Sequence, residues 1–389
     1  MDKPLALLNN LTPAQFLAEY WQKKPLFIRQ AIPNFKSFVT PDNLIDLAMD
    51  DDVVARLITN KNGQWKVKSN PLNTRDFAKL PHTTSGKLFW TLLVQNVNHY
   101  LPESADLLAL FNFIPHARLD DLMISYAPQG SGIGAHVDSY DVFLLQGAGT
   151  RKWQIASQTD LSLVQDAPLK ILQNFVPQQE WILEAGDMLY LPPKIAHCGT
   201  SMSSDCMTYS IGFRAPKQQE LAHEFLSYLQ DNLDKKVHLN GFYTDADLTQ
   251  QQHPAEITDA IQDKVMATLQ NIVWDKNMIA DFLGHFFTEP KSHVYFDAPK
   301  EISLAAFTKK LSKMPIKLHL KSQLLFTQKA FYMNGETLDV PANLTTCMRE
   351  LADKRHLHTP ELQTSLQANL IADLGEVLYA CYLAGFIDF

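Results

Sequence analysis

The stretch GAHVDSYDVFLLQGAGTRKWQIA, residues 134–156, joins two candidate ligand residues to two apolar segments. The segments DVFLLQ and RKWQIA have the length and composition of β-strands. Between them lies GAGT, a run of small residues that forms turns readily. The stretch therefore predicts a β-hairpin whose second strand begins at Arg151.

Further segments of the same kind lie on both sides of this stretch. They are DLMISYA (121–127), DMLYLPP (187–193) and CMTYSIGF (206–213). In the first of them, Met123, Ser125 and Ala127 share one face, because strand side chains alternate. Several short strands separated by Gly- and Pro-containing turns predict a β-sandwich or a barrel. We expect this domain to span residues 1–216 and to open with a helix, TPAQFLAEYWQKK, capped by Thr12.

Residues 217–290 have a helical pattern. The segment QQELAHEFLSYLQDNL places Leu221, Phe225, Leu226 and Leu229 near one face, and PAEITDAIQDKVMATLQNIV and MIADFLGHFF continue the pattern. Amphipathic helices either cover the core of their own chain or bury a face against a partner. The second possibility makes this region a candidate dimerisation domain.

Residues 291–389 mix helix and strand. SLAAFTKKLSK predicts a helix, IKLHLKSQLLFTQKAFYMNGETLDV predicts strands with a tight turn at NGE, and LGEVLYACYLAGFIDF predicts a closing helix. A small winged-helix-like domain fits this order. The lysines of this region more often form a solvated face than a nucleic-acid site, so we expect at most a weak contact with RNA; they are Lys309, Lys310, Lys313, Lys317 and Lys321.

The composition limits the class of protein. The chain has 389 residues, 46% of them hydrophobic, and a formal net charge of -8. That charge does not favour non-specific binding to nucleic acid. The 4 cysteines form no C-x-x-C pair, and we find neither a signal peptide nor a membrane-spanning segment. We therefore expect a cytoplasmic protein that makes no membrane contact.

His136 and Asp138 are candidate metal ligands. Two residues apart on an extended segment, their side chains leave the same face. An H-x-D pair alone is weak evidence, but His197 follows the strand in GDMLYLPPKIAH and can supply a third ligand. Two histidines and one carboxylate form the facial triad of non-haem iron(II) oxygenases, which leaves positions for a 2-oxo acid and O₂. Zinc accepts the same ligands and stays an alternative.

An enzyme that uses 2-oxoglutarate also needs a cation for the distal carboxylate. Arg151 and Lys152 begin the second predicted strand, and alternation allows only one of them to point inward. We favour Arg151, which can bind a carboxylate with two hydrogen bonds. Hydroxyls on neighbouring strands could complete the cosubstrate site, namely those of Ser125, Thr208 and Ser210. Asp120, Tyr140 and Asp141 are candidates for the mouth of the cleft.

DLMISYAPQGSGIGAHVDSYDVFLLQGAGTRKWQI and GDMLYLPPKIAHCGTSMSSDCMTYSIGFRAP resemble the JmjC-type cupin oxygenases, and most of all the bacterial ribosomal oxygenases. FLAEYWQKKPLFIRQAI and LVQNVNHY carry the same resemblance. It covers nearly the whole chain and is strongest over residues 121–216. The resemblance implies an α+β protein with a double-stranded β-helix (jelly-roll, cupin) core, a helical middle domain that forms a homodimer, and a winged-helix-like C-terminal domain.

The resemblance also implies an activity. It is the hydroxylation of an arginine in a large-subunit ribosomal protein, the sixteenth in the usual naming, with Fe(II), 2-oxoglutarate and O₂. It assigns His136, Asp138 and His197 to the iron and Arg151 to the cosubstrate. Two other functions stay open: a cupin that senses a ligand or regulates through nucleic acid, and a histone-type demethylase of the same fold.

Overall fold

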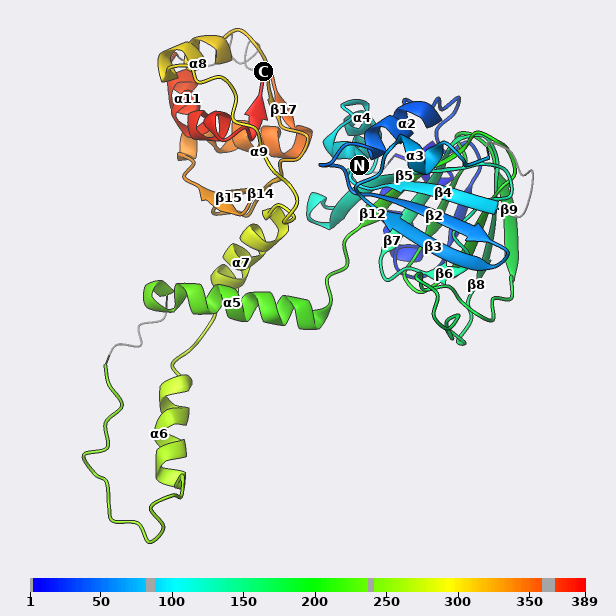
Figure 1. The fold of residues 1–389 in the computed structure, drawn as a ribbon. Helices are drawn as coiled ribbons and strands as arrows, with labels where there is room; N and C mark the ends of the chain where they lie inside the picture. Colours follow the sequence, from blue (N-terminus) through cyan, green and yellow to red (C-terminus); the bar gives the residue numbers. More distant parts are fainter. Residues whose placement is uncertain (1–2, 82–87, 237–240, 359–367) are drawn as a thin grey trace. The chain divides into compact units, whose positions relative to one another are not determined.

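The computed structural model of the chain describes residues 3–81, 88–236, 241–358 and 368–389. The chain forms two compact units, Met1–Ala215 and Pro216–Phe389 (Figure 1). The N-terminal unit carries the strands predicted around the opening motif. The C-terminal unit carries the helical segments and the second mixed region.

Two antiparallel sheets make up the N-terminal unit. The larger sheet contains β1 (Leu26–Ile28), β2 (Ala55–Lys61), β3 (Gln64–Ser69), β4 (Leu88–Val94), β5 (Leu119–Ala127), β7 (Asp141–Ala148), β10 (Met188–Leu191) and β12 (Cys206–Phe213). The smaller sheet contains β6 (His136–Val137), β8 (Arg151–Ala156), β9 (Gln179–Leu183) and β11 (Ala196–Ser201). Their orders are β1-β10-β7-β12-β5-β4-β2-β3 and β6-β11-β8-β9. The predicted jelly-roll core is confirmed.

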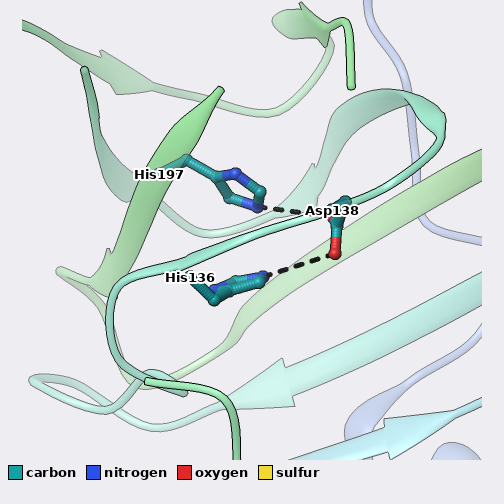
Figure 2. Close-up of side chains that lie close together, drawn as sticks. All are labelled: His136, Asp138 and His197. Atoms are coloured by element: carbon teal, nitrogen blue, oxygen red, sulfur yellow. Dashed lines mark ion pairs between the residues drawn. The ribbon is translucent and has the colours of Figure 1, made fainter. Parts of the chain in front are cut away.

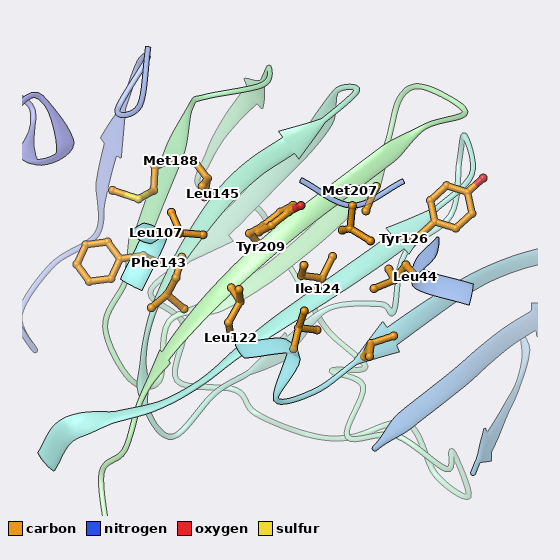
Figure 3. Close-up of a cluster of buried hydrophobic side chains, with 14 of the residues drawn as sticks. Leu44, Leu107, Leu122, Ile124, Tyr126, Phe143, Leu145, Met188, Met207 and Tyr209 are labelled. Carbon is orange, nitrogen blue, oxygen red and sulfur yellow. The ribbon is translucent and has the colours of Figure 1, made fainter. Parts of the chain in front are cut away.

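One face of the larger sheet packs against N-terminal helices. This unit contains η1 (Ala6–Leu8), α1 (Pro13–Glu19), α2 (Pro41–Ala48), α3 (Thr74–Phe77), η2 (Val97–His99), α4 (Glu103–Ala109) and η3 (His116–Arg118). Phe16, Leu44 and Leu107 from these helices join the buried cluster that contains Phe143 and Tyr209 of the sheet (Figure 3). Phe16 of α1 belongs to the same cluster. The opposite face of the sheet is left for the functional site, because side chains alternate along each strand.

The helix predicted from Thr12 is confirmed, and it is shorter than the sequence pattern. The Thr12 hydroxyl accepts a hydrogen bond from the Gln15 backbone, and the Gln15 side chain accepts one from the Thr12 backbone. This reciprocal pair satisfies two of the free N–H groups at the helix start. The helix ends at Glu19, where the chain turns toward β1.

The predicted hairpin between DVFLLQ and RKWQIA is wrong. Both strands form, but β7 pairs with β10 and β12, whereas β8 pairs with β9 and β11. The turn therefore passes from one sheet to the other. Gly149, at φ +62°, lies in this turn, where a left-handed backbone favours glycine. Arg151 thus enters β8 on the smaller sheet.

The C-terminal unit begins with helices α5 (Gln218–Lys236), α6 (Asp259–Leu269) and α7 (Lys276–Thr288). These confirm the helical segments predicted for the middle of the chain. The predicted common face of α5 is correct in part: Leu229 is buried, but Leu226 is 59% exposed. Leu226 lies about 100° around the helix from Phe225, which rotates it off the packed face.

The end of the chain forms a compact mixed element. It contains α8 (Leu304–Leu311), β13 (Ile316–Leu318), β14 (Leu324–Phe326), β15 (Phe331–Met333), β16 (Glu336–Leu338), η4 (Ala342–Leu344), α9 (Thr345–Lys354), β17 (His356–Leu357), α11 (Ala368–Leu383) and β18 (Ile387–Asp388). The strands form two small sheets, β17-β13-β18 and β14-β15-β16. The predicted turn at NGE is confirmed: Asn334 and Gly335 both have positive φ, as a two-residue hairpin turn requires.

α7 contacts β14, β15 and β16, and its Gly284 lies against the ring of Tyr332. The division into 1–216, 217–290 and 291–389 stays a prediction, because the structure separates two units and not three parts. Over the residues described above, no helix is long and apolar enough to cross a membrane.

Candidate functional site

His136, Asp138 and His197 come together although Asp138 and His197 are far apart in the sequence. His136 opens β6, and its Cα partner across the antiparallel pair is His197 of β11. Asp138 directly follows β6. A register shift of one residue would turn His197 to the other face, so this strand pair determines the cluster.

Figure 2 shows both imidazole rings directed toward the Asp138 carboxylate. Nε2 of His197 lies 3.5 Å from Oδ2 of Asp138, and Nε2 of His136 lies 4.0 Å from Oδ1. The three ligand atoms all lie within 4.8 Å of one another, close enough to bind a single metal ion. This is the only such group of His, Cys, Asp and Glu residues found in the described parts of the chain.

The protonation of the two histidines suits a metal. Nδ1 of His136 lies 3.1 Å from the carbonyl oxygen of Gly134, and Nδ1 of His197 lies 2.9 Å from that of Ile195. Each carbonyl requires a proton on Nδ1, which leaves the Nε2 lone pair free for a metal. Burial, helped by His136, lowers the pKa of His197 to about 3, so this ring is neutral at physiological pH. Burial also raises the pKa of Asp138.

The cluster opens into a cavity of about 460 Å³ between the two sheets. Arg151 and Trp153 of β8 line this cavity, and Lys152 does not, so the prediction that Arg151 points inward is confirmed. Arg151 is 4% exposed. The Arg151 guanidinium lies over the Trp153 ring, 5.5 Å from its centre.

Several residues that line the cavity carry a buried polar atom without a hydrogen-bond partner. These atoms are Nε of Arg56, Oγ1 of Thr91, Nη2 of Arg151 and Nε1 of Trp153, and they are all the buried side-chain atoms without a hydrogen bond found in the described residues. A buried polar group without a partner costs roughly 1–3 kcal/mol. Their concentration around one cavity indicates a site whose partners come from a bound polar molecule.

The three predicted hydroxyls also reach this cavity. Ser125 on β5 and Thr208 on β12 are direct cross-strand partners, and Ser210 lies two residues further along β12. All three are buried and line the cavity. The Thr208 hydroxyl donates to Oε1 of Gln146 at 3.1 Å, so its hydrogen is already committed within the sheet.

Two of the three residues predicted at the mouth of the cleft line the cavity, and the third does not. Asp120 and Tyr140 line the cavity together with Asp121. Burial and the nearby carboxylates raise the pKa of Tyr140, and Arg56 opposes them. Asp141 does not line the cavity, so its prediction as a mouth residue is wrong. It accepts hydrogen bonds from the Tyr190 hydroxyl and from Gln22, because its position on β7 has the parity of the core-facing residues.

Arg56, Thr91 and Gln95 line the cavity although nothing in the motif around His136 points to them. Arg56 belongs to β2 and Thr91 to β4, strands that join the larger sheet beside β5. The available signal was the alternation in ARLITNK (55–61), in which Arg56 and Ile58 share a face.

Known proteins match both units of the chain. Residues 106–221 match the JmjC domain family, and residues 270–386 match the ROXA-like winged helix family. The chain is 35% identical over 289 residues to the ribosomal protein uL16 3-hydroxylase of Escherichia coli, covering 74% of this chain and 74% of the relative.

Solved structures are similar to this chain over nearly its full length. The X-ray structure of E. coli ycfD superposes with a TM-score of 0.83 and 28% identity, covering 100% of both chains. A second structure of that ribosomal oxygenase was solved with cobalt and 2-oxoglutarate. It superposes with a TM-score of 0.79 and 28% identity, covering 97% of both chains.

Proposed function

Because the chain belongs to the JmjC-domain ribosomal oxygenases, we propose that it is a metal- and 2-oxoglutarate-dependent hydroxylase of a ribosomal protein. The observation that carries the proposal is one cavity with two complementary features. It holds three ligand atoms that can bind a single metal, and it holds the buried guanidinium of Arg151 with an unpaired Nη2.

The metal we propose is Fe(II). Two imidazole nitrogens and one carboxylate oxygen form the ligand set of non-haem iron(II) oxygenases. His136, Asp138 and His197 would hold the ion, and when bound it supplies the oxidation in which 2-oxoglutarate and O₂ become succinate and CO₂ while a C–H bond becomes C–OH. The neutral His197 binds without first losing a proton.

Arg151 would bind the distal carboxylate of 2-oxoglutarate. A buried guanidinium needs an anionic or acceptor partner, and a carboxylate accepts two parallel N–H bonds from it. Ser125, Ser210 and Thr208 lie on the strands beside this position and extend the polar wall. Arg151 is 4% exposed and lies over the Trp153 ring, and an ionic interaction is stronger where water is excluded.

The substrate we propose is an arginine of a large-subunit ribosomal protein. The matched relative from E. coli is named for the hydroxylation of uL16. In this chain, Asp120, Asp121 and Tyr140 line the cavity that contains the metal ligands. Carboxylates and an aromatic ring are the partners that a cationic guanidinium requires.

We also propose a cytoplasmic homodimer in which residues 1–216 catalyse, residues 217–290 dimerise and residues 291–389 form the winged-helix domain. Large apolar side chains of the middle region support dimerisation, because they are exposed; they include Phe242, Ile257, Met266, Leu269, Val273 and Trp274. Contact with ribosomal RNA would be weak, since the chain has a net charge of -8.

A reconstitution tests the activity. The purified chain is incubated with Fe(II), 2-oxoglutarate, O₂ and the large-subunit ribosomal protein, and the protein substrate is mapped by tandem mass spectrometry. We expect one added oxygen on an arginine, with an equal amount of succinate. Succinate without a modified protein would contradict the substrate, and the absence of both would contradict the activity.

A further inference from the structure

A buried chain of hydrogen bonds lies behind Arg151 and connects the two sheets. Nε of Arg151 on β8 donates to Sγ of Cys206 on β12 at 3.3 Å. Nε2 of Gln146 on β7 donates to the same sulfur at 3.4 Å. Gln146 and Cys206 are fully buried, and Arg151 is nearly so.

The orientation of the Gln146 amide follows from its partners. Its nitrogen lies 2.7 Å from the carbonyl oxygen of Ala148, which can only accept, so this atom must be Nε2. The amide oxygen is then the atom that faces Thr208 and accepts its hydroxyl hydrogen at 3.1 Å. Thr208 therefore presents only lone pairs to the cavity.

Cys206 restricts how Arg151 can bind an anion. A guanidinium offers two edges for a bidentate carboxylate, one formed by Nε and Nη2 and the other by Nη1 and Nη2. The contact with Cys206 occupies Nε, so the edge formed by Nη1 and Nη2 stays available. Nη2 is the nitrogen that is buried without a partner.

We propose that Cys206 and Gln146 are positioning residues for the cosubstrate. They anchor Nε of Arg151 so that the guanidinium edge formed by Nη1 and Nη2 meets the distal carboxylate of 2-oxoglutarate. This inference rests on the proposed function and deepens it. The donor hydroxyls beside the carboxylate are then Ser125 and Ser210, because a carboxylate accepts hydrogen bonds and the Thr208 hydrogen is committed to Gln146.

A positioning role differs from a structural one in its ligand dependence. If Cys206 acts through Arg151, its loss weakens only ligands that carry the distal carboxylate. If Cys206 merely packs the core, its loss affects every ligand of the cavity to the same extent. The pair 2-oxoglutarate and 2-oxobutyrate separates the cases, because 2-oxobutyrate keeps the 2-oxo acid end and lacks the distal carboxylate.

The experiment measures the dissociation constants of both ligands for the full chain loaded with Co(II), without O₂, by calorimetry. The variants are Cys206→Ala, Cys206→Ser, Gln146→Met and Arg151→Leu, with the double variant of Arg151→Leu and Cys206→Ala. Cys206→Val, whose larger side chain leaves no cavity and carries no hydrogen-bonding atom, replaces Cys206→Ala if the smaller residue lowers the yield of folded protein.

We expect Cys206→Ala to raise the dissociation constant of 2-oxoglutarate about tenfold, which corresponds to the loss of one hydrogen bond to a charged group. The dissociation constant of 2-oxobutyrate stays within about twofold of the wild-type value. Cys206→Ser keeps a hydrogen-bond acceptor and should therefore retain most of the wild-type affinity for 2-oxoglutarate. Gln146→Met shows the same selectivity. In the Arg151→Leu background, Cys206→Ala causes no further loss of affinity for 2-oxoglutarate.

An equal change for both ligands, or no change for either, would overturn the positioning role. That outcome is distinct from a failure of the proposed function, in which the wild-type chain itself shows no preference for 2-oxoglutarate over 2-oxobutyrate.

Discussion

The Nε2 atom of His197 lies 3.5 Å from the Asp138 carboxylate because β11 pairs with β6 in a register that sets His197 opposite His136. The centres of the two imidazole rings lie 4.2 Å apart. Two of the three ligand side chains thus belong to one cross-strand pair, and Asp138 follows it along the chain. The geometry of this candidate metal site therefore depends on the short pairing of β6 with β11.

Removal of a proposed metal ligand should greatly weaken metal binding and leave the fold intact. We expect His136→Ala and Asp138→Ala to weaken Fe(II) or Co(II) binding by more than about a hundredfold, since losing a group that merely holds a ligand in place already costs about 10–100-fold. Metal content after dialysis and calorimetric titration measure this loss. His253→Ala, at an exposed histidine, is the matched control and should bind metal as the wild type does. Equal affinity in Asp138→Ala would refute this ligand assignment.

Replacement of Arg151 should affect the cosubstrate and not the metal. Arg151→Leu should raise the KM for 2-oxoglutarate by about a hundredfold, because the loss of a buried charge-assisted pair costs about 3 kcal/mol. Arg151→Lys keeps the charge and should lose less. Lys152→Ala, its neighbour outside the cavity, serves as the control. A KM for Arg151→Leu that matches the control would contradict a carboxylate contact.

Asp281 on α7 should stabilise the C-terminal unit. Its carboxylate accepts hydrogen bonds from the hydroxyls of Tyr228 on α5, at 2.5 Å, and Tyr332 on β15, at 3.0 Å. We expect Asp281→Ala to lower the free energy of unfolding by roughly 1–3 kcal/mol, because two partly buried phenols lose their acceptor. Urea denaturation measures the change, with Asp263→Ala on the exposed face of α6 as the control. A shift no larger than that of the control would show that the contact adds no stability.

The same contact predicts a loss of stability at high pH. Burial and the hydrogen bond to Asp281 raise the pKa of Tyr332 from 10.0 to about 12. Between these values the unfolded phenol gives up its proton and the folded one keeps it, so the unfolded state binds fewer protons and stability falls as the pH rises. Tyr332→Phe should lose less stability than the wild type from pH 10 to 12. Parallel pH profiles would contradict the raised pKa.

The exposed apolar side chains of α6 should lie in a dimer interface. Met266 and Leu269 are 58% and 56% exposed on this helix. The double change Met266→Glu and Leu269→Glu should shift the chain toward monomers, because charges at a buried interface are costly. Sedimentation equilibrium measures the mass, and Gln262→Glu controls for added charge on the same helix. An unchanged dimer in the double variant, or a monomeric wild-type chain, would contradict a dimer interface at α6.

The grouping of His136, Asp138 and His197 could be predicted from the sequence because the signals are local. H-x-D on an extended segment fixes two side chains on one face, and His197 follows a recognisable strand and turn. Alternation also predicted that Arg151 would point inward while Lys152 would not. These inferences need only the geometry of one strand at a time.

The features that were predicted wrongly or not at all depend on pairing between distant strands. The alternation around Arg151 does not reveal that β7 and β8 lie in different sheets, because a tight turn can join strands within a sheet or between sheets. Arg56 and Thr91 reach the cavity only through the pairing of β2 and β4 with β5. The contact between Arg151 and Cys206 bridges the two sheets, so no spacing in the sequence predicts it.

The most direct test of the central claim is mass spectrometry of ribosomal proteins from cells that contain the intact gene and from cells in which it encodes the His136→Ala chain. We predict one additional oxygen on an arginine of a large-subunit ribosomal protein in the first cells and its absence in the second. An identical set of ribosomal protein masses in the two kinds of cell would contradict the claim that this chain is a ribosomal protein hydroxylase.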